Sequence, residues 1–259
     1  MKPVQSGRDD KSGKPKRSTT TPKPSGVDTA PAALAAAQAF AVRHGLQIVG
    51  FDSSGIAEST VDEIAAALYD ILGKYPFLDL GGIEITDLRG GAVSRVAWDR
   101  GVGETDGAMA AAWIVLDKSI VENTANLAEK ISAATQSGSI VAGSDERPMY
   151  SVMVHDLGRI LEAAAGTRAR ASAQRFLITE YRRINGSWDR GDTLARIVAG
   201  YRAWRGQLSR GCFSGGRFDA RAGLVGAFAE VELRGADACG PAGVLHRLVV
   251  ECARGRASG

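Results

Sequence analysis

Segments with strand-like periodicity are confined to the first half of this 259-residue chain. Between residues 47 and 116, apolar and polar residues alternate or gather in short apolar runs, as they do in β-strands. From residue 123 onward, every periodic segment repeats its apolar residues at helical spacing. A chain that completes its strands before a helical second half is expected to be an α+β protein, with one small sheet packed beside the helices.

Four short strands are expected in that first half. Gln47–Phe51 is a short β-type run, and residues 112–116 form an apolar run typical of a strand buried on both faces. Ile83–Leu88 and Val93–Trp98 each alternate apolar and polar residues on either side of a turn at residues 89–91. We therefore expect these last two segments to pair as a β-hairpin.

The expected helices combine a 3.6-residue apolar period with capping residues at their ends. The helix over residues 59–72 has Ser59 or Thr60 as its N-cap, and Gly73 follows it. Asn123 or Thr124, and Asp192, are the expected N-caps of two later helices. The remaining helices are expected at residues 32–43, 123–137, 147–165, 168–184, 192–204, 219–233 and 241–252.

The first 31 residues differ in composition from the rest of the chain. They hold five of the eight prolines and seven lysines and arginines against three aspartates, a net charge of +4. Large apolar side chains are almost absent there, so burial could not offset the entropy of ordering the segment. We expect a disordered basic tail at residues 1–31, followed by one domain at 32–259 whose sheet-containing part is about 46–118 and whose helical part is 168–253.

Neither a membrane span nor an export signal is evident in the sequence. No apolar run approaches the roughly 18 residues that a span requires, and the N-terminus lacks the apolar core of a signal peptide. The three cysteines are Cys212, Cys239 and Cys252, and none forms a C-x-x-C pair. Reduced thiols and a cytoplasmic protein with no membrane partner are the expectation.

One expected helix, residues 147–165, carries a polar cluster at helical spacing. Its central residues are His155, Asp156, Leu157, Gly158 and Arg159. In the H-E-x-x-H motif of zinc peptidases, two histidines one helical turn apart bind one ion, and the glutamate deprotonates a zinc-bound water. The spacing here matches that motif, but only the first of its three residues is present.

The layout around this helix resembles that of the zincins, in particular the lethal-factor-like type and a family found in actinobacteria and their phages. In that family the motif helix usually reads close to H-E-F-G-H, and a later helix with the pattern E-x-x-x-E-A-F-A supplies a third ligand. Residues 222–229 end in the same Ala-Phe-Ala and resemble that later helix. The resemblance covers about Gln47–Glu251 and implies a zincin-like fold.

Carried across residue by residue, the resemblance leaves little of the catalytic chemistry. It implies that His155 matches the first zinc ligand and that Asp156 stands at the general-base position, one methylene too short. Arg159 then occupies the second-ligand position, although a guanidinium has no lone pair for a metal. The third ligand falls on Ala222 and a supporting glutamate on Gly226, so no metal is expected.

Ion pairing is expected to replace the metal. Asp156, Arg159 and Glu162 follow one another at three-residue intervals, so the arginine can bridge the two carboxylates on one helix face. The function expected from the resemblance is that of a catalytically inactive zincin-like domain with a structural or protein-binding role. It would be associated with a virion if the chain is phage-encoded.

Two alternatives stay open. An active zinc peptidase could use rearranged ligands, with Asp219, Glu230, Glu232 or His246 joining His155. A nucleic-acid-associated protein could act through residues 1–31, helped by Tyr201, Trp188 and Trp204, which interleave with arginines. Aromatic residues at helical spacing are more often core residues whose rim arginines cover.

Overall fold

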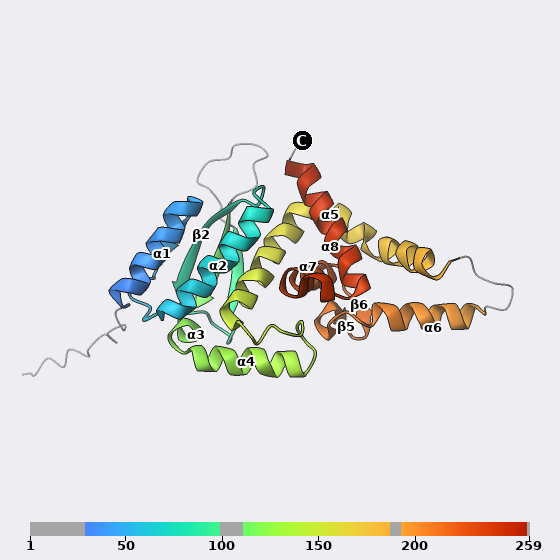
Figure 1. Cartoon of the computed structure of the whole chain (residues 1–259), viewed down its shortest axis with the longest axis horizontal. Coiled ribbons are helices and arrows are strands. Elements are labelled where there is room, and N and C mark those ends of the chain that lie inside the picture. Colours follow the sequence, from blue (N-terminus) through green and yellow to red (C-terminus); the bar gives the residue numbers. More distant parts are fainter. Residues whose placement is uncertain (1–28, 99–110, 187–192, 258–259) are drawn as a thin grey trace, which may run out of the picture.

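The computed structural model describes residues 29–98, 111–186 and 193–257. It confirms the α+β fold, in which a four-stranded mixed sheet is followed by a mostly helical C-terminal half (Figure 1). Residues 1–28 of the expected tail, the expected cap Asp192 and Trp188 lie outside the described residues. Within them, no helix is both long enough and apolar enough to cross a membrane.

The sheet has the strand order β1-β2-β4-β3. β1 is parallel to β2 and β2 is parallel to β4, while β3 pairs antiparallel with β4. The central pairing places Ile83 beside Ile114, and Val96 pairs with Ile114 from the other side. The strands span Gln47–Val49 (β1), Leu80–Thr86 (β2), Ser94–Trp98 (β3) and Ala112–Asp117 (β4).

The predicted hairpin between residues 83–88 and 93–98 is wrong, because β4 lies between these two strands. All residues of β4 except Trp113 are buried, so this strand is most stable with a hydrogen-bonded neighbour on each side. No residue of β3 is buried, which suits a strand at the sheet's edge. Alternation along each strand indicated its two faces but not its neighbour.

Three helices lie side by side against the sheet in Figure 1. They are α1 (Pro31–His44), α2 (Glu58–Lys74) and the first half of α5 (Pro148–Asn185). α2 contacts both α1 and α5, and α5 also contacts β3 at the sheet's edge. α2 begins just before the predicted N-cap residues, and Ala57 takes the cap position.

Side chains of α2 bind the start of α5. The Glu63 Oε2 atom accepts hydrogen bonds from the backbone N–H groups of Met149 and Tyr150, at 2.8 and 3.0 Å. The Tyr150 hydroxyl donates to Asp70 Oδ2 at 2.9 Å. A carboxylate at a helix N-terminus satisfies free N–H groups and complements the helix dipole. This contact fixes where the motif helix begins relative to the sheet.

α5 is divided by a kink at Gly166, whose backbone has φ 70° and ψ −164°. The kink falls between the two helices predicted from the sequence, at residues 147–165 and 168–184. The second part of α5 runs out from the body beside α6 (Leu194–Arg205), and the two form a projecting arm (Figure 1). Tyr181, Tyr201 and Trp204 pack against one another between the two helices of this arm.

The remaining elements complete the helical half and its connections. α5, α7 and α8 contact one another extensively and enclose the C-terminal part of the core. Between α6 and α7, residues 213–218 form a short two-stranded ribbon. The elements are α3 (Lys118–Glu122), α4 (Thr124–Gln136), η1 (Arg210–Cys212), β5 (Phe213–Ser214), β6 (Arg217–Phe218), α7 (Ala220–Arg234), η2 (Gly235–Asp237) and α8 (Gly240–Ala257).

Candidate functional site

A cleft of about 330 Å³ lies between α5, α7 and the segment that precedes α7. His155 and Arg159 of α5 line one side, and Ala222 and Gly226 of α7 line the other. These are the four positions to which the zincin resemblance assigns two motif ligands, a third ligand and a supporting residue. The structure therefore brings the sequence-predicted positions of the two helices to one cleft.

A glycine within the motif allows α5 and α7 to approach this closely. A Cβ atom added at Gly158 would lie 2.9 Å from the Phe228 ring of α7, closer than packed side chains tolerate. Phe228 is itself fully buried. The residue between His155 and Arg159 thus determines the spacing of the two helices that form the cleft.

His155 is uncharged in this environment. Burial, reinforced by the nearby positive charge of Arg159, lowers the pKa of His155 from 6.5 to about 4. Its Nε2 atom is enclosed and finds no hydrogen-bond partner within the described residues. A neutral imidazole is the form that binds metals, but one histidine alone does not define a metal site.

Asp156 is 1% exposed, and Arg159 lies beside it. The Arg159 Nη1 atom donates to Asp156 Oδ1 at 2.8 Å, which is the local ion pair drawn from their three-residue spacing. Burial raises the pKa of Asp156 to about 6, although Arg159 and the hydroxyl of Ser94 in β3 act in the opposite direction. The carboxylate of Asp156 is thus engaged by a permanent cation.

Glu162 does not share Arg159 as the sequence suggested. Its fully buried carboxylate accepts hydrogen bonds from Arg170 Nε and, at 3.1 Å, from Arg170 Nη2. The Nε atom of Arg221 in α7 lies 3.3 Å from Glu162 Oε2. Arg170 follows the kink at Gly166, so the bend in α5 lets an arginine eight residues away reach back to Glu162.

One of the two cleft positions on α7 lacks room for the carboxylate that the zincin resemblance places there. A Cβ atom added at Gly226 would lie 2.8 Å from Cys212 Sγ, so the thiol occupies the space of a supporting side chain. Asp219 also lines the cleft, but its Oδ1 atom caps α7 by accepting from Ala222 N at 3.0 Å. Asp219 is therefore already committed as a helix cap.

The other three substitute ligands considered from the sequence lie in different networks. Glu230 accepts a hydrogen bond from Cys239 N at 2.8 Å and pairs with Arg234. Glu232 and His246 face each other at 3.2 Å, away from the residues that line the His155 cleft. Within the ranges that the structure describes, no three His, Cys, Asp or Glu side chains converge as metal ligands would.

Sequence reasoning missed the cluster that surrounds Glu232. Its carboxylate accepts from Lys74 Nζ and from the Tyr75 hydroxyl, each at 2.6 Å, and it faces His246. Burial alone would raise the pKa of Glu232, but these three contacts together lower it to about 2. α2 and α7 are about 160 residues apart in the chain, so no local pattern could signal this cluster.

The cleft can bind polar groups more readily than it can activate water. Arg159 and Arg221 are at least half exposed there, and Ser139 and Ser209 contribute hydroxyl groups beside the neutral His155. Guanidinium and hydroxyl donors recognise carboxylates and backbone carbonyls, which are the groups a polypeptide offers.

Comparison of the chain with protein-family models, curated proteins and solved structures found no match.

Proposed function

We propose that this protein is a catalytically inactive zincin-like domain with a protein-binding or structural role. The observation that carries the proposal is the convergence of His155, Arg159, Ala222 and Gly226 on one cleft. A zincin requires these positions to face each other. Three of the four side chains cannot bind zinc, and Arg159 forms an ion pair where the second ligand would stand.

The position of β3 gives independent support. The zincin layout places an edge strand of the sheet along the cleft, next to the motif helix. β3 is the strand at the end of the described sheet, and it contacts α5. Ser94 at the start of β3 acts on Asp156, since its hydroxyl helps to lower the pKa of that carboxyl against the effect of burial. A role in a virion or in host interaction would follow from the phage resemblance alone.

Restoring the missing ligands tests the proposal. The triple variant Asp156→Glu, Arg159→His and Ala222→Glu combines two histidines one helical turn apart with a glutamate on the facing helix. If the zincin geometry is present, this variant should bind about one zinc ion per chain, because a three-ligand site plus water is a complete catalytic zinc site. Zinc content after dialysis and titration calorimetry measure the gain, and circular dichroism checks folding.

The matched control is the double variant Asp156→Glu, Arg159→His, which lacks the ligand from α7. It should bind zinc more weakly than the triple variant if α7 faces the motif helix as in zincins. Equal zinc affinity in the two variants, or none in a folded triple variant, would contradict the zincin-like assignment.

An active zinc peptidase with rearranged ligands is the second candidate function. The observation in its favour is that Asp219 lines the same cleft as His155. Two results together would favour this candidate over the inactive domain. The natural protein would contain stoichiometric zinc and hydrolyse a protein substrate in a chelator-sensitive way, and the His155→Ala variant would lose both properties. The inactive domain predicts neither zinc nor hydrolysis.

A further inference from the structure

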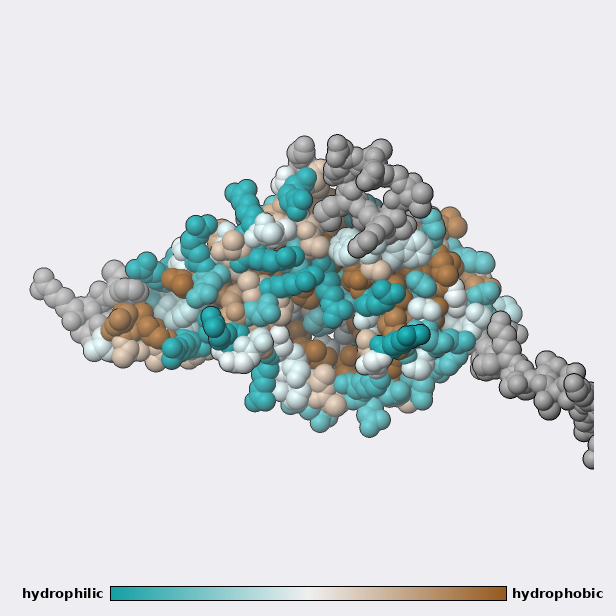
Figure 2. Space-filling view, turned by 180° about the vertical axis from the view of Figure 1, so that it is seen from behind, coloured by the Kyte–Doolittle hydropathy of each residue, from teal (hydrophilic) through white to brown (hydrophobic). Residues whose placement is uncertain are grey.

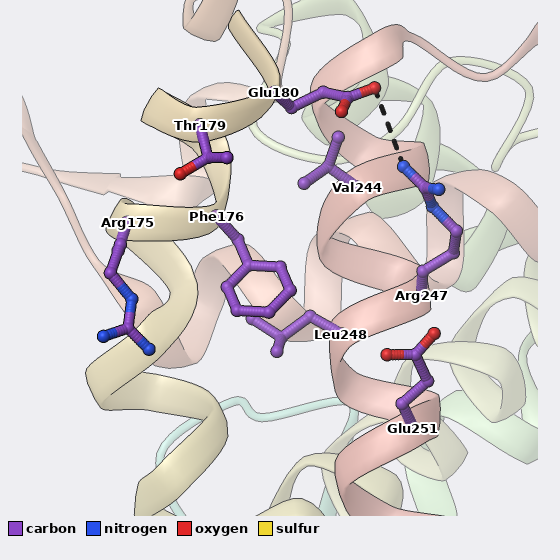
Figure 3. Close-up of a pocket in the computed structure, with 8 residues that line it drawn as sticks. All are labelled: Arg175, Phe176, Thr179, Glu180, Val244, Arg247, Leu248 and Glu251. Atoms are coloured by element: carbon purple, nitrogen blue, oxygen red, sulfur yellow. Dashed lines mark ion pairs between the residues drawn. The ribbon is translucent and has the colours of Figure 1, made fainter. Parts of the chain in front are cut away.

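A groove runs between the second half of α5 and α8. None of the residues that line it also lines the candidate cleft. Two cavities of about 270 and 370 Å³ adjoin one another along it. They share Arg175 and Phe176 of α5, and Leu248 and Glu251 of α8, so they form one continuous depression. Figure 3 shows the cavity at the Thr179 and Val244 end of the groove, where Phe176 points between the two helices beside Leu248.

Each helix lines the groove with one stripe of residues. From α5 the stripe includes Ala165, Arg168, Ser172, Phe176 and Thr179, which follow at intervals of three or four residues. α8 contributes a stripe at the same spacing, from Val244 to Gly255. On the C-terminal side of the kink at Gly166, the α5 stripe from residue 168 to 180 is about 18 Å long. Two such stripes side by side can hold a third helix of about three turns.

The floor of the groove is apolar. Phe176 remains 39% exposed, although its ring is a large apolar surface that folding usually buries. Leu248 and Val244 are buried on the α8 side and lie next to it (Figure 3). An aromatic anchor over aliphatic residues is the kind of centre around which protein interfaces concentrate their binding energy.

Arginines surround this floor. Arg168, Arg175 and Arg256 line the groove, are exposed, and have no ion-pair partner in the described part of the chain. Of the two glutamates that line it, Glu180 already binds Arg183 through two hydrogen bonds and lies 3.7 Å from Arg247. The groove therefore offers more positive charge than its own acidic side chains neutralise.

The same sign of charge extends over the neighbouring helices. The second half of α5 with α6 and α8 carries eleven arginines against two glutamates, a net charge of +9. The described residues before Gly166 carry eight lysines and arginines against fifteen aspartates and glutamates, a net charge of −7. Such segregation steers an acidic partner toward the helical end of the molecule.

We propose that this groove binds an amphipathic helix with acidic flanks, supplied by a partner protein. The apolar stripe of that helix would lie on Phe176 and Leu248, and its carboxylates would pair with Arg168, Arg175 and Arg256. An apolar floor favours this occupant over nucleic acid, because phosphates gain nothing from contact with Leu248 and Val244. The proposal does not depend on whether the domain is zincin-like.

The test is a binding titration with a designed peptide about three turns long, with leucines at helical spacing and glutamates at its other positions. Fluorescence anisotropy of the labelled peptide should show saturable binding to the full chain that weakens with salt. Arg168→Glu with Arg175→Glu, and separately Phe176→Ala, should each weaken binding about tenfold or more. Arg89→Glu and Tyr69→Ala are matched controls, because both residues are exposed on other elements, and they should leave the affinity unchanged.

Three outcomes would overturn the proposal. The first is the absence of saturable binding by the acidic peptide. The second is equal binding by a peptide in which lysines replace the glutamates, or in which the leucines are scrambled. The third is tighter binding of a single-stranded oligonucleotide than of the peptide, with the same loss in the Arg168→Glu and Arg175→Glu variant, which would make the groove a nucleic-acid surface.

Discussion

His155 and Asp156, neighbours on α5, have pKa values shifted in opposite directions. Burial lowers the pKa of His155 to about 4 and raises that of Asp156 to about 6. Both shifts have the same origin, since an enclosed site disfavours the charged form of each group. The consequences for stability are opposite. Between about pH 4 and pH 6 the folded protein holds a proton on Asp156 that the unfolded chain releases, and lacks one on His155 that the unfolded chain binds.

We expect these two contributions to offset each other in the natural protein and to separate in single variants. Each is worth about 3 kcal/mol over its own range. The contribution of Asp156 to the free energy of unfolding falls with rising pH, and Asp156→Asn removes it. The stability of this variant relative to the natural protein should therefore increase from pH 4 to pH 6. His155→Gln removes the opposite term, so its relative stability should decrease from pH 4 to pH 6.5. Urea unfolding across this pH range measures both differences.

The comparison with the natural protein cancels the titration of groups that all three proteins share. The double variant Asp156→Asn, His155→Gln serves as the control and should differ from the natural protein by an amount nearly independent of pH. Parallel pH profiles for the two single variants would show that neither residue is enclosed as the structure has it.

At the scale of elements, the kink at Gly166 lets the two halves of α5 pack in two different parts of the molecule. Its φ of 70° and ψ of −164° belong to a backbone region open to glycine and strained for other residues. A Cβ atom there would also lie 2.5 Å from Arg256 Nη1. The bend directs the first half of α5 along the sheet and the second half into the arm, and it returns Arg170 to Glu162.

Gly166→Ala should therefore destabilise the protein by about 1–3 kcal/mol. The control is Gly73→Ala in α2, where an added Cβ meets nothing within 4 Å and the backbone is helical. That substitution should be neutral or stabilising by up to about 1 kcal/mol, because alanine is the better helix former. Chemical denaturation of both variants compares them. Equal effects of the two changes would mean that α5 tolerates a continuous helix at residue 166.

The elements also show which features the sequence could predict. Helical periodicity and capping residues act over a few positions, so the helices, the break near residue 166 and the Asp156–Arg159 pair could be predicted. Strand neighbours are chosen by burial across the whole sheet, and β4 therefore displaced the expected hairpin. The partners of Glu162 and Glu232 lie across a kink or on another helix, beyond any local pattern.

At the scale of the whole molecule, the projecting arm differs from the body that carries it. No residue of α6 is buried, whereas α7 buries Leu224, Phe228 and five further residues. Ile184, Leu194 and Val198 remain exposed at the arm, and Figure 2 shows apolar residues gathered near its end. The aromatic cluster of Tyr181, Tyr201 and Trp204 packs α6 against α5, and α6 itself adds no buried residue to the common core.

A segment with few buried contacts opens at a lower free energy than the global unfolding transition. We therefore expect α6 to exchange its amide hydrogens well before α7, as measured by hydrogen–deuterium exchange with mass spectrometry. Trp204→Ala should accelerate exchange further in α6 and in the end of α5, because the indole packs on Tyr181 at 5.7 Å between ring centroids. Exchange in α7 and the sheet should stay unchanged. Equal protection of α6 and α7 would mean that the arm unfolds only together with the body, and a change in sheet exchange in the Trp204→Ala variant would lead to the same conclusion.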